Sequence, residues 1–346
     1  MAIPVSILIC TRNRASHLRD TLRSVRQISI PDHLTPELIV VDNGSTDDTP
    51  EAVRATAIEN LPLRRVVEPT PGVARARNTA IQNATGEILL WLDDDVRVPV
   101  DWLYCMTRPI LESGVDAVAG TVEFPSHLQR DWMRPFHRTT LASTESIDSE
   151  APENIISANM AFNRAVLADV SGFDPELGPG SRVGALEDTL FSWQLRDAGY
   201  RIGRVTETAV EHHFDEHRLS REAFIQAAIA RGKSLAYIRY HWLHYSQEDW
   251  THRSHAHEVW RHPRLILAKR LTDWIIQRWL HWLRAHPAPI GRREFWTILN
   301  AYSLRQYLQE RTRTRNYRKR GLQKIHGEKE RQSVSLTSVS KSPSRG

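Results

Sequence analysis

The stretch Ile88-Leu89-Leu90-Trp91-Leu92-Asp93-Asp94-Asp95 places three carboxylates directly after five apolar residues. An apolar run of this length predicts a buried strand, so the carboxylates fall at its carboxyl end. Two carboxylates one residue apart can point into one crevice and hold a hard divalent cation, which the phosphates of a nucleotide then complete. Taken alone, an acidic turn in solvent is the commoner explanation, so the rest of the sequence decides between the two.

Strand-like and helix-like segments alternate through the first half of the chain. Strands are predicted at residues 5–10, 38–41, 66–67 and 88–92, and helices around 18–25 and at 73–83. This alternation predicts a mostly parallel sheet covered by helices on both faces. Ligands of such sheets bind at the carboxyl ends of the strands, where Thr11, Asp42 and Asp93 all fall.

The second predicted strand stops at the turn sequence Asp42-Asn43-Gly44-Ser45. Ser45 or Thr46 is suited to cap the following helix, with Asp47 and Asp48 in its first turn.

The second half of the chain is less regular. Residues 124–154 are polar and punctuated by proline, which predicts a long loop with short helices that serves as a lid or acceptor wall. Regular structure is expected from Ile155 to about Phe214, followed by three helical segments at 220–240, 256–284 and 292–312. The tail from Thr312 is rich in Arg, Lys and Ser and is expected to be disordered.

Composition sets the broad class of protein. The 346 residues are 40% hydrophobic, enough for a substantial core, which excludes wholesale disorder. The only cysteines, Cys10 and Cys105, sit in apolar stretches and indicate a reducing compartment. The apolar run at residues 5–10 is too short for a signal peptide, and no apolar stretch is long enough for a transmembrane helix. We therefore expect a cytoplasmic protein.

The C-terminal third is strongly basic. Residues 1–260 hold 26 Lys and Arg against 36 Asp and Glu, a net charge of −10, whereas residues 261–346 hold 20 against 5, a net charge of +15. This asymmetry predicts a polyanionic partner. Residues 256–284 combine tryptophans at near-helical spacing with arginines and lysines, as in helices that lie on an anionic membrane surface. A helix packing its tryptophan face on the protein explains the pattern equally well. No nucleic-acid module is recognisable, so no specific nucleic-acid partner is expected.

The order of motifs resembles that of family 2 glycosyltransferases of the GT-A fold. The matching segments of the first half are residues 5–14, 39–49, 72–80 and 88–99, and those of the second half are 157–162, 172–174 and 187–200. A Walker-type phosphate loop and a Gly-x-Gly-x-x-Gly after the first strand are both missing, which removes the commoner nucleotide-binding folds.

The resemblance implies a fold class and a domain organisation. The fold is α/β, a Rossmann-like GT-A fold with a mostly parallel sheet, helices on both faces and a C-terminal helical extension. Residues 1–240 would form the glycosyltransferase domain, with a nucleotide-binding half at 1–123 and an acceptor half at 155–240. Residues 241–312 would form the helical extension and 313–346 the disordered tail.

The same resemblance implies the donor site. Thr11 and Arg14 would line the nucleoside pocket, and Asp42 would accept a hydrogen bond from a uracil-type base. Arg77, with Arg75 as a substitute, would lie near the base and phosphates. Asp93 and Asp95 correspond to the family's Asp-x-Asp pair, one reaching toward the ribose and the other binding the metal. Further nucleotide-sugar contacts are expected from Asp94, whose side chain would turn away from the metal, and from Asn159.

Glu187-Asp188 is the second acidic motif. In the family, the Asp of this pair is the general base that deprotonates the acceptor hydroxyl. An acidic pair in the first turn of a helix is also favoured by the helix dipole alone, and both explanations can hold together. Three glycines ahead of the pair favour a mobile loop. The family often has Gly directly before this pair, whereas this chain has Leu186, which leaves the backbone path there open.

His212 and His213 follow a Val-Glu pair that resembles a family stretch in which a His contacts the diphosphate or metal. Imidazole is a common ligand of divalent ions. Spacing favours His212, although a histidine is more often a surface or satisfied core residue.

Together these features predict an inverting, non-processive transferase that uses Mn²⁺ or Mg²⁺. The donor would be a nucleoside-diphosphate sugar, UDP-type first, and the acceptor a glycan or lipid-linked hydroxyl. The enzyme would be cytoplasmic and peripheral on the inner face of the membrane. The alternatives are a sugar nucleotidyltransferase and a noncatalytic sugar-binding or scaffold protein with the same fold.

Overall fold

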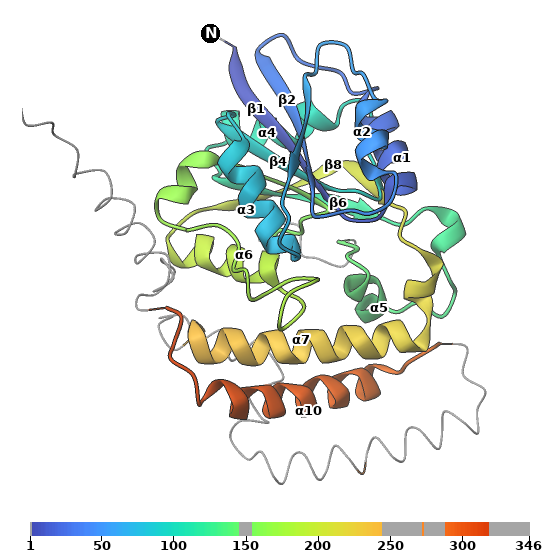
Figure 1. Cartoon of the computed structure of the whole chain (residues 1–346), viewed down its shortest axis with the longest axis vertical. Coiled ribbons are helices and arrows are strands. Elements are labelled where there is room, and N and C mark those ends of the chain that lie inside the picture. The colour runs from blue at the N-terminus through green and yellow to red at the C-terminus, as the bar shows by residue number, and fades with distance from the viewer. Residues whose placement is uncertain (1, 145–153, 244–271, 273–287, 318–346) are drawn as a thin grey trace, which may run out of the picture.

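The computed structural model describes residues 2–144, 154–243, 272 and 288–317 (Figure 1). Within this part of the chain, eight strands form one sheet in the order β3-β2-β1-β4-β7-β6-β8-β5. The strands are β1 Ile3–Thr11, β2 Leu34–Asp42, β3 Leu63–Val67, β4 Ile88–Asp93, β5 Val96–Arg97, β6 Ala117–Glu123, β7 Asn159–Asn163 and β8 Ile202–His212.

The sheet divides into a parallel part and a mixed part. Strands β3, β2, β1 and β4 are all parallel, as the alternation of strands and helices predicts. Beyond β4, strand β7 is antiparallel to its two neighbours, β4 and β6. Strand β8 is parallel to β6 and antiparallel to β5. The GT-A-type α/β class is confirmed.

Helices cover both faces of the sheet because successive strand residues point to opposite sides. On β1, Ile7 and Ile9 enter one hydrophobic cluster and Leu8 enters another. The first cluster is covered by α1 Ala15–Val25, α2 Thr49–Arg54 and α4 Trp102–Glu112, and the second by α3 Val73–Asn83 and α6 Glu187–Asp197.

Two long helices, α7 Arg221–His241 and α10 Arg292–Glu310, lie side by side at one end of the molecule (Figure 1). They run in the same direction, because Arg221 bonds to Glu294 near one end and His241 to Glu310 near the other. A methyl group on Gly232 of α7 would lie 2.2 Å from the Leu299 carbonyl oxygen, so the helices touch backbone to backbone. None of the described helices has both the length and the apolar character required to cross a membrane.

The remaining elements are short. They are η1 Ser126–Leu128, α5 Pro135–Thr140, η2 Arg164–Ala168 and η3 Glu216–Leu219. The first two lie in the segment predicted to be a loop with short helices. Residues 256–284, where a tryptophan-rich helix is predicted, fall outside the described residues apart from Thr272.

Two local predictions were wrong. Helix α2 begins at Thr49, and neither Ser45 nor Thr46 caps it, because both bond to Asn13 in the loop after β1. Asp47 lies ahead of the helix and accepts hydrogen bonds from the backbone of Thr49 and Ala15.

Residues 313–317, expected to belong to a disordered tail, are described by the structure. Tyr317 is 2% exposed, and its hydroxyl donates to Asp174 at 2.6 Å.

Candidate active site

Three strand ends bring polar side chains to one edge of the sheet. In the β1–β2 register Thr11 lies opposite Asp42, and in the β1–β4 register Cys10 lies opposite Asp93. Because these strands are parallel neighbours, the carboxyl ends meet, as the sequence predicted. The candidate donor site is built at this edge.

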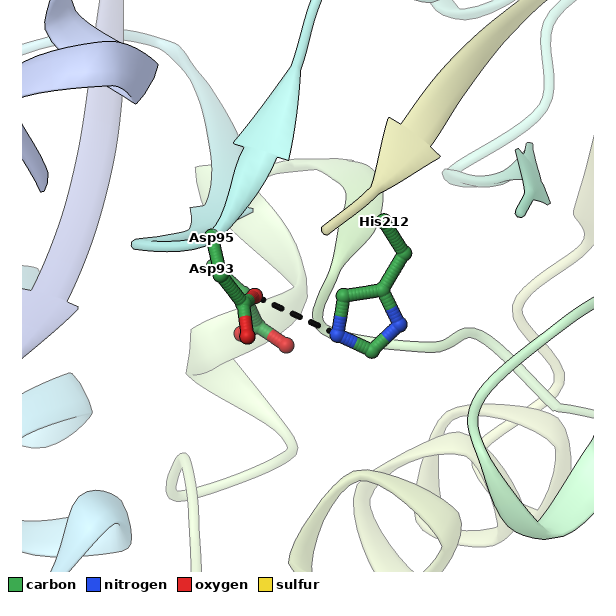
Figure 2. Close-up of side chains that lie close together, drawn as sticks. All are labelled: Asp93, Asp95 and His212. Carbon is green, nitrogen blue, oxygen red and sulfur yellow. Dashed lines mark ion pairs between the residues drawn. The ribbon is translucent and has the colours of Figure 1, made fainter. Parts of the chain in front are cut away.

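Asp93, Asp95 and His212 form a candidate metal centre, with one potential ligand atom from each residue lying within 4.8 Å of the others (Figure 2). Asp93 ends β4, and Asp95 lies just before β5. His212 ends β8, where its backbone is paired with Val96, and this pairing carries the imidazole to the acidic run. His213 instead bonds to Glu211.

The hydrogen bonds of His212 suit a metal ligand. Its Nδ1 lies 3.1 Å from the Leu141 carbonyl oxygen, which can only accept, so Nδ1 carries the proton. In the neutral ring, Nε2 then presents its lone pair 3.2 Å from Oδ1 of Asp95. A backbone carbonyl on the outer nitrogen is a common way for a protein to orient a metal-binding imidazole. The three residues therefore fit a divalent cation.

The crowding of the carboxylates also indicates a cation site. Burial raises the pKa of Asp93, and it raises that of Asp94 to about 7, with the neighbouring carboxylates adding to both effects. Burial also raises the pKa of Asp95, but the charged form of the His212 ring, together with Arg14, outweighs it and holds that pKa below its usual range; a bound cation would take the place of the ring proton. A bound cation would offset the repulsion among these groups.

Thr11 and Arg14 hold the acidic run in place. Thr11 donates its hydroxyl proton to Asp94 at 2.6 Å, and Arg14 pairs with Asp94 and Asp95 at 3.3 and 2.7 Å. Asp94 is thereby tied to the loop after β1 and is not a member of the Asp93–Asp95–His212 group. Thr11 is buried, so its direct interaction is with this carboxylate.

Arg77 connects the two acidic motifs. From α3, its guanidinium lies 3.7 Å from Asp93 and 2.5 Å from Glu187, and it donates to Ser157 at 2.6 Å. Arg77 is 4% exposed, whereas Arg75 faces solvent. One buried cation thus joins the end of β4 to the start of α6.

Asp188 follows Glu187 in the first turn of α6. Burial and the adjacent Glu187 charge raise its pKa to about 6, against an opposing effect of Arg77. Its carboxylate accepts the Thr189 backbone N–H at 2.7 Å. A carboxylate with this pKa is matched to proton transfer near neutral pH.

The loop before Asp188 depends on a strained residue. Leu186 adopts φ 65° and ψ 26°, the left-handed conformation that glycine adopts without cost. Its side chain packs against the cluster that contains Leu190, Tyr237 and Trp242. The family's frequent glycine is therefore replaced by a residue with the same positive φ plus an apolar anchor.

Two predicted donor-site residues are held within the protein. Asn159 is fully buried, and its amide accepts from Trp102 Nε1 and donates to the Thr121 carbonyl. We therefore correct its assignment from sugar contact to structural bridge. Asp42 is also buried and is held by Arg65, whose Nε and guanidinium nitrogen lie 3.1 and 2.6 Å away. Arg65 was missed because its partner lies on the neighbouring strand.

The fold and the acidic edge define a GT-A-type glycosyltransferase. A mannosyltransferase of Pyrobaculum calidifontis, PcManGT, solved with GDP-Man and Mn²⁺, has the same fold at a TM-score of 0.56 and 20% identity, covering 89% of this chain and 87% of that one. The model described as Glycosyl transferase family 2 matches residues 6–170. This match to just under half of the chain supports the family 2 glycosyltransferase resemblance that its motifs predicted.

Two relatives agree with this assignment. Glycosyltransferase AglE of Haloferax volcanii is 31% identical over 201 residues, which cover 57% of this chain and 63% of the relative. Succinoglycan biosynthesis protein ExoM of Rhizobium meliloti is 29% identical over 221 residues, covering 62% of this chain and 69% of the relative. The match thus spans just under two thirds of the length of AglE.

Proposed function

We propose that this protein transfers a sugar, with inversion, from a nucleoside-diphosphate sugar to a hydroxyl group of a glycan or lipid-linked acceptor. The observation that carries the proposal is the position of Arg77, which contacts Asp93 of the candidate metal centre and Glu187 beside Asp188. In this proposal, the site for the anionic leaving group and the basic carboxylate lie on two sides of one buried cation.

The donor side would hold the diphosphate. Asp93, Asp95 and His212 would bind Mn²⁺ or Mg²⁺, which when present offsets the negative charge of the departing diphosphate. Arg77 adds fixed positive charge at the same place. The donor complex of PcManGT, which contains GDP-Man and Mn²⁺, supports a nucleotide sugar and a metal. It also adds GDP-sugars to the UDP-sugars as candidate donors.

The acceptor side would supply the proton acceptor. Asp188 takes the proton of the acceptor hydroxyl as its oxygen attacks the anomeric carbon, and the bond to the diphosphate breaks on the opposite face. Arg77 neutralises Glu187, so Asp188 is the carboxylate of the pair that is left to act as base. The name of ExoM supports a glycan acceptor. Binding to an anionic membrane through residues 256–284 stays a prediction.

The test is a donor assay across UDP-, GDP- and dTDP-sugars with Mn²⁺, Mg²⁺ or EDTA. We expect one donor to release a nucleoside diphosphate only with a divalent ion, and Asp95→Asn to lose this release. Asp32→Asn, at an exposed carboxylate, is the matched control. Formation of a nucleoside-diphosphate sugar and pyrophosphate from a nucleoside triphosphate and a sugar 1-phosphate would indicate a nucleotidyltransferase instead. Binding without turnover of any donor would indicate a noncatalytic protein, and full activity in EDTA would refute the metal. The anomeric coupling of the product in proton NMR checks inversion.

A further inference from the structure

A cavity of about 440 Å³ lies next to the candidate metal centre, between α5, η3 and the start of α7. Leu141 and Arg218 both line it. The Leu141 carbonyl oxygen is the partner of His212 Nδ1, and a guanidinium nitrogen of Arg218 lies 3.5 Å from His212 Nε2. The cavity is large enough for a sugar-sized group and shares a wall with the metal centre.

Arg218, which lines this cavity, and Arg231, one turn beyond the lining residue Ala227 on α7, form no ion pair with any described residue. Arg218 lies over the Phe214 ring at 5.3 Å, and its hydrogen-bond contact is with His212. Arg231 donates only to the carbonyl oxygens of Thr139 and Thr140, at 3.1 and 3.5 Å. Both guanidinium groups are partly buried. Cations removed from water are usually paired with an acid, so these two mark a place for an anion.

The face of α7 that lines the cavity also carries Arg231, on which the charge of the proposed base Asp188 acts. Ala223 and Ala227 line the cavity, and Arg231 follows one turn later on the same face. Arg231 also bonds to the carbonyl of Thr140, another lining residue. Among the charges that act on Arg231, the Asp188 carboxylate has the largest effect, and Arg218 is the other. Arg231 therefore lies within the electrostatic influence of both Arg218 and Asp188.

We propose that this cavity binds a phosphate group of the acceptor substrate, with Arg218 and Arg231 as its anchors. The inference rests on the proposed function and names the class of acceptor: a hydroxyl compound that carries phosphate. Two guanidinium groups match a phosphate dianion in charge, and each presents paired N–H donors to its oxygens. The first turn of α7, beginning at the cap residue Ser220, adds a favourable dipole.

The cavity has one unfavourable group, the exposed Glu222. Its carboxylate repels an anion, so the phosphate is expected away from Glu222, between Arg218 and Arg231. In that position the acceptor's hydroxyl extends toward the base. The phosphate of a soluble sugar phosphate and that of a lipid carrier would both be bound by these arginines in the same way.

The first experiment measures phosphate binding with the donor site already filled. The protein is saturated with Mg²⁺ and the nucleoside diphosphate released in the donor assay, and inorganic phosphate is then titrated by calorimetry. We expect millimolar binding that weakens about tenfold in Arg231→Gln. Arg292→Gln, at an exposed arginine, and acetate, a monoanion, are the controls. The Arg292→Gln protein should bind phosphate normally, and acetate should bind poorly.

The same titrations test the proposed function and the phosphate site separately. Failure of the nucleoside diphosphate and Mg²⁺ to bind would remove the proposed function itself. Normal nucleotide binding with no phosphate binding, or with equal binding in Arg231→Gln, would overturn only the acceptor site. Arg231→Lys keeps the charge but loses the paired N–H donors, so it should bind phosphate with intermediate affinity. This variant also controls for a folding defect in Arg231→Gln.

A second experiment identifies the source of the phosphate. Transfer is measured to a soluble sugar phosphate, to a polyprenyl-diphosphate-linked sugar in detergent, and to the neutral sugar. One of the phosphate-bearing acceptors should be preferred, with inorganic phosphate inhibiting competitively against it and not against the donor. Equal transfer to the neutral sugar, without inhibition, would contradict the proposal.

Discussion

The donor and acceptor sides of this molecule hold their carboxylates in different ways. Asp42 and Asp93 sit at the ends of β2 and β4, the parallel strands on either side of β1, so the sheet register alone brings them to the same edge. Asp188 sits on the first turn of α6, behind the loop of residues 174–186, which contains three glycines with positive φ. The carboxylates of the donor side are positioned by strands of the sheet, whereas the position of Asp188 on the acceptor side depends on the contacts that hold the loop of residues 174–186.

The loop is held by residues far along the chain. Asp174 accepts hydrogen bonds from the hydroxyls of Tyr237 and Tyr317, at 2.8 and 2.6 Å. Arg182 pairs with the fully buried Glu310 at 2.6 Å. Helices α7 and α10 and the segment after α10 therefore act as the support of the acceptor side. Changes on the two sides should have separable effects.

Asp188→Asn should produce the largest effect. The variant keeps the size of the side chain but removes the proton acceptor, so transfer should fall by about 10²–10⁴-fold. Metal and nucleotide binding, which belong to the donor side, should remain. Calorimetry with Mn²⁺ and the nucleoside diphosphate, together with transfer rates, checks both parts. Full transfer activity would refute the base assignment, and lost nucleotide binding would refute the separation of the two sides.

Glu310→Gln tests the support of the acceptor loop. Glu310 is fully buried and accepts from His241, Arg182 and Gln306, and its pKa is lowered to about 2 from 4.5. Its removal leaves Arg182 without this partner and should cost on the order of 3 kcal/mol of unfolding free energy. Chemical denaturation at neutral pH measures the loss.

The pH dependence of that loss has a defined sign. Because the folded-state pKa of Glu310 lies below the unfolded value, its stabilisation is complete above pH 4.5 and disappears as pH falls toward about 2. The wild type and Glu310→Gln should therefore converge in stability in acid. A constant difference from pH 7 to pH 3 would contradict the role of the ionised carboxylate.

The transfer rate should depend on pH through Asp188. The pKa of this group is raised to about 6, and the base acts only when deprotonated. Below that pH, the rate under substrate-limited conditions should fall about tenfold per pH unit. Nucleotide binding measured over the same range should not follow the same curve. A flat rate profile between pH 5 and pH 7 would show that proton removal is not limiting or that another group performs it.

Substitutions of Leu186 should have the smallest effect. Leu186→Ala keeps the positive φ but loses the apolar contact, whereas Leu186→Gly loses the contact and relieves the backbone. The glycine variant should be more stable than the alanine variant by about 1 kcal/mol, the reverse of the usual order within a helix. Thermal unfolding of the two variants tests this. An alanine variant more stable than the glycine variant would argue against strain at this position.

The sequence predicted the donor side better than the acceptor side for a physical reason. Apolar runs and turn residues are local signals, and they located β1, β2, β4 and, from Gly72, the start of α3. Parallel pairing then placed Thr11, Asp42 and Asp93 at one edge. The capping of α2 was wrong because Asn13 recruits Ser45 and Thr46, a contact between loops that no local pattern contains.

Long-range partners account for the other omissions. Arg231 lies on a helix whose existence was predicted but whose orientation toward Asp188 depends on how α7 packs. Asn159 resembles a family motif residue, yet its bonding to Trp102 is set by the packing of α4 on the sheet. Tyr317 lies in a polar, basic segment, and its position is set by long-range contacts such as its hydrogen bond to Asp174.

The hydrogen bond between His212 and the Leu141 carbonyl joins two binding events. Leu141 lines the phosphate cavity, while His212 offers its other nitrogen to the metal centre. An acceptor that shifts Leu141 must change the affinity of His212 for the ion. By thermodynamic reciprocity, the ion then changes acceptor affinity by the same factor. The affinities for the metal and for the acceptor are thus coupled through one backbone carbonyl.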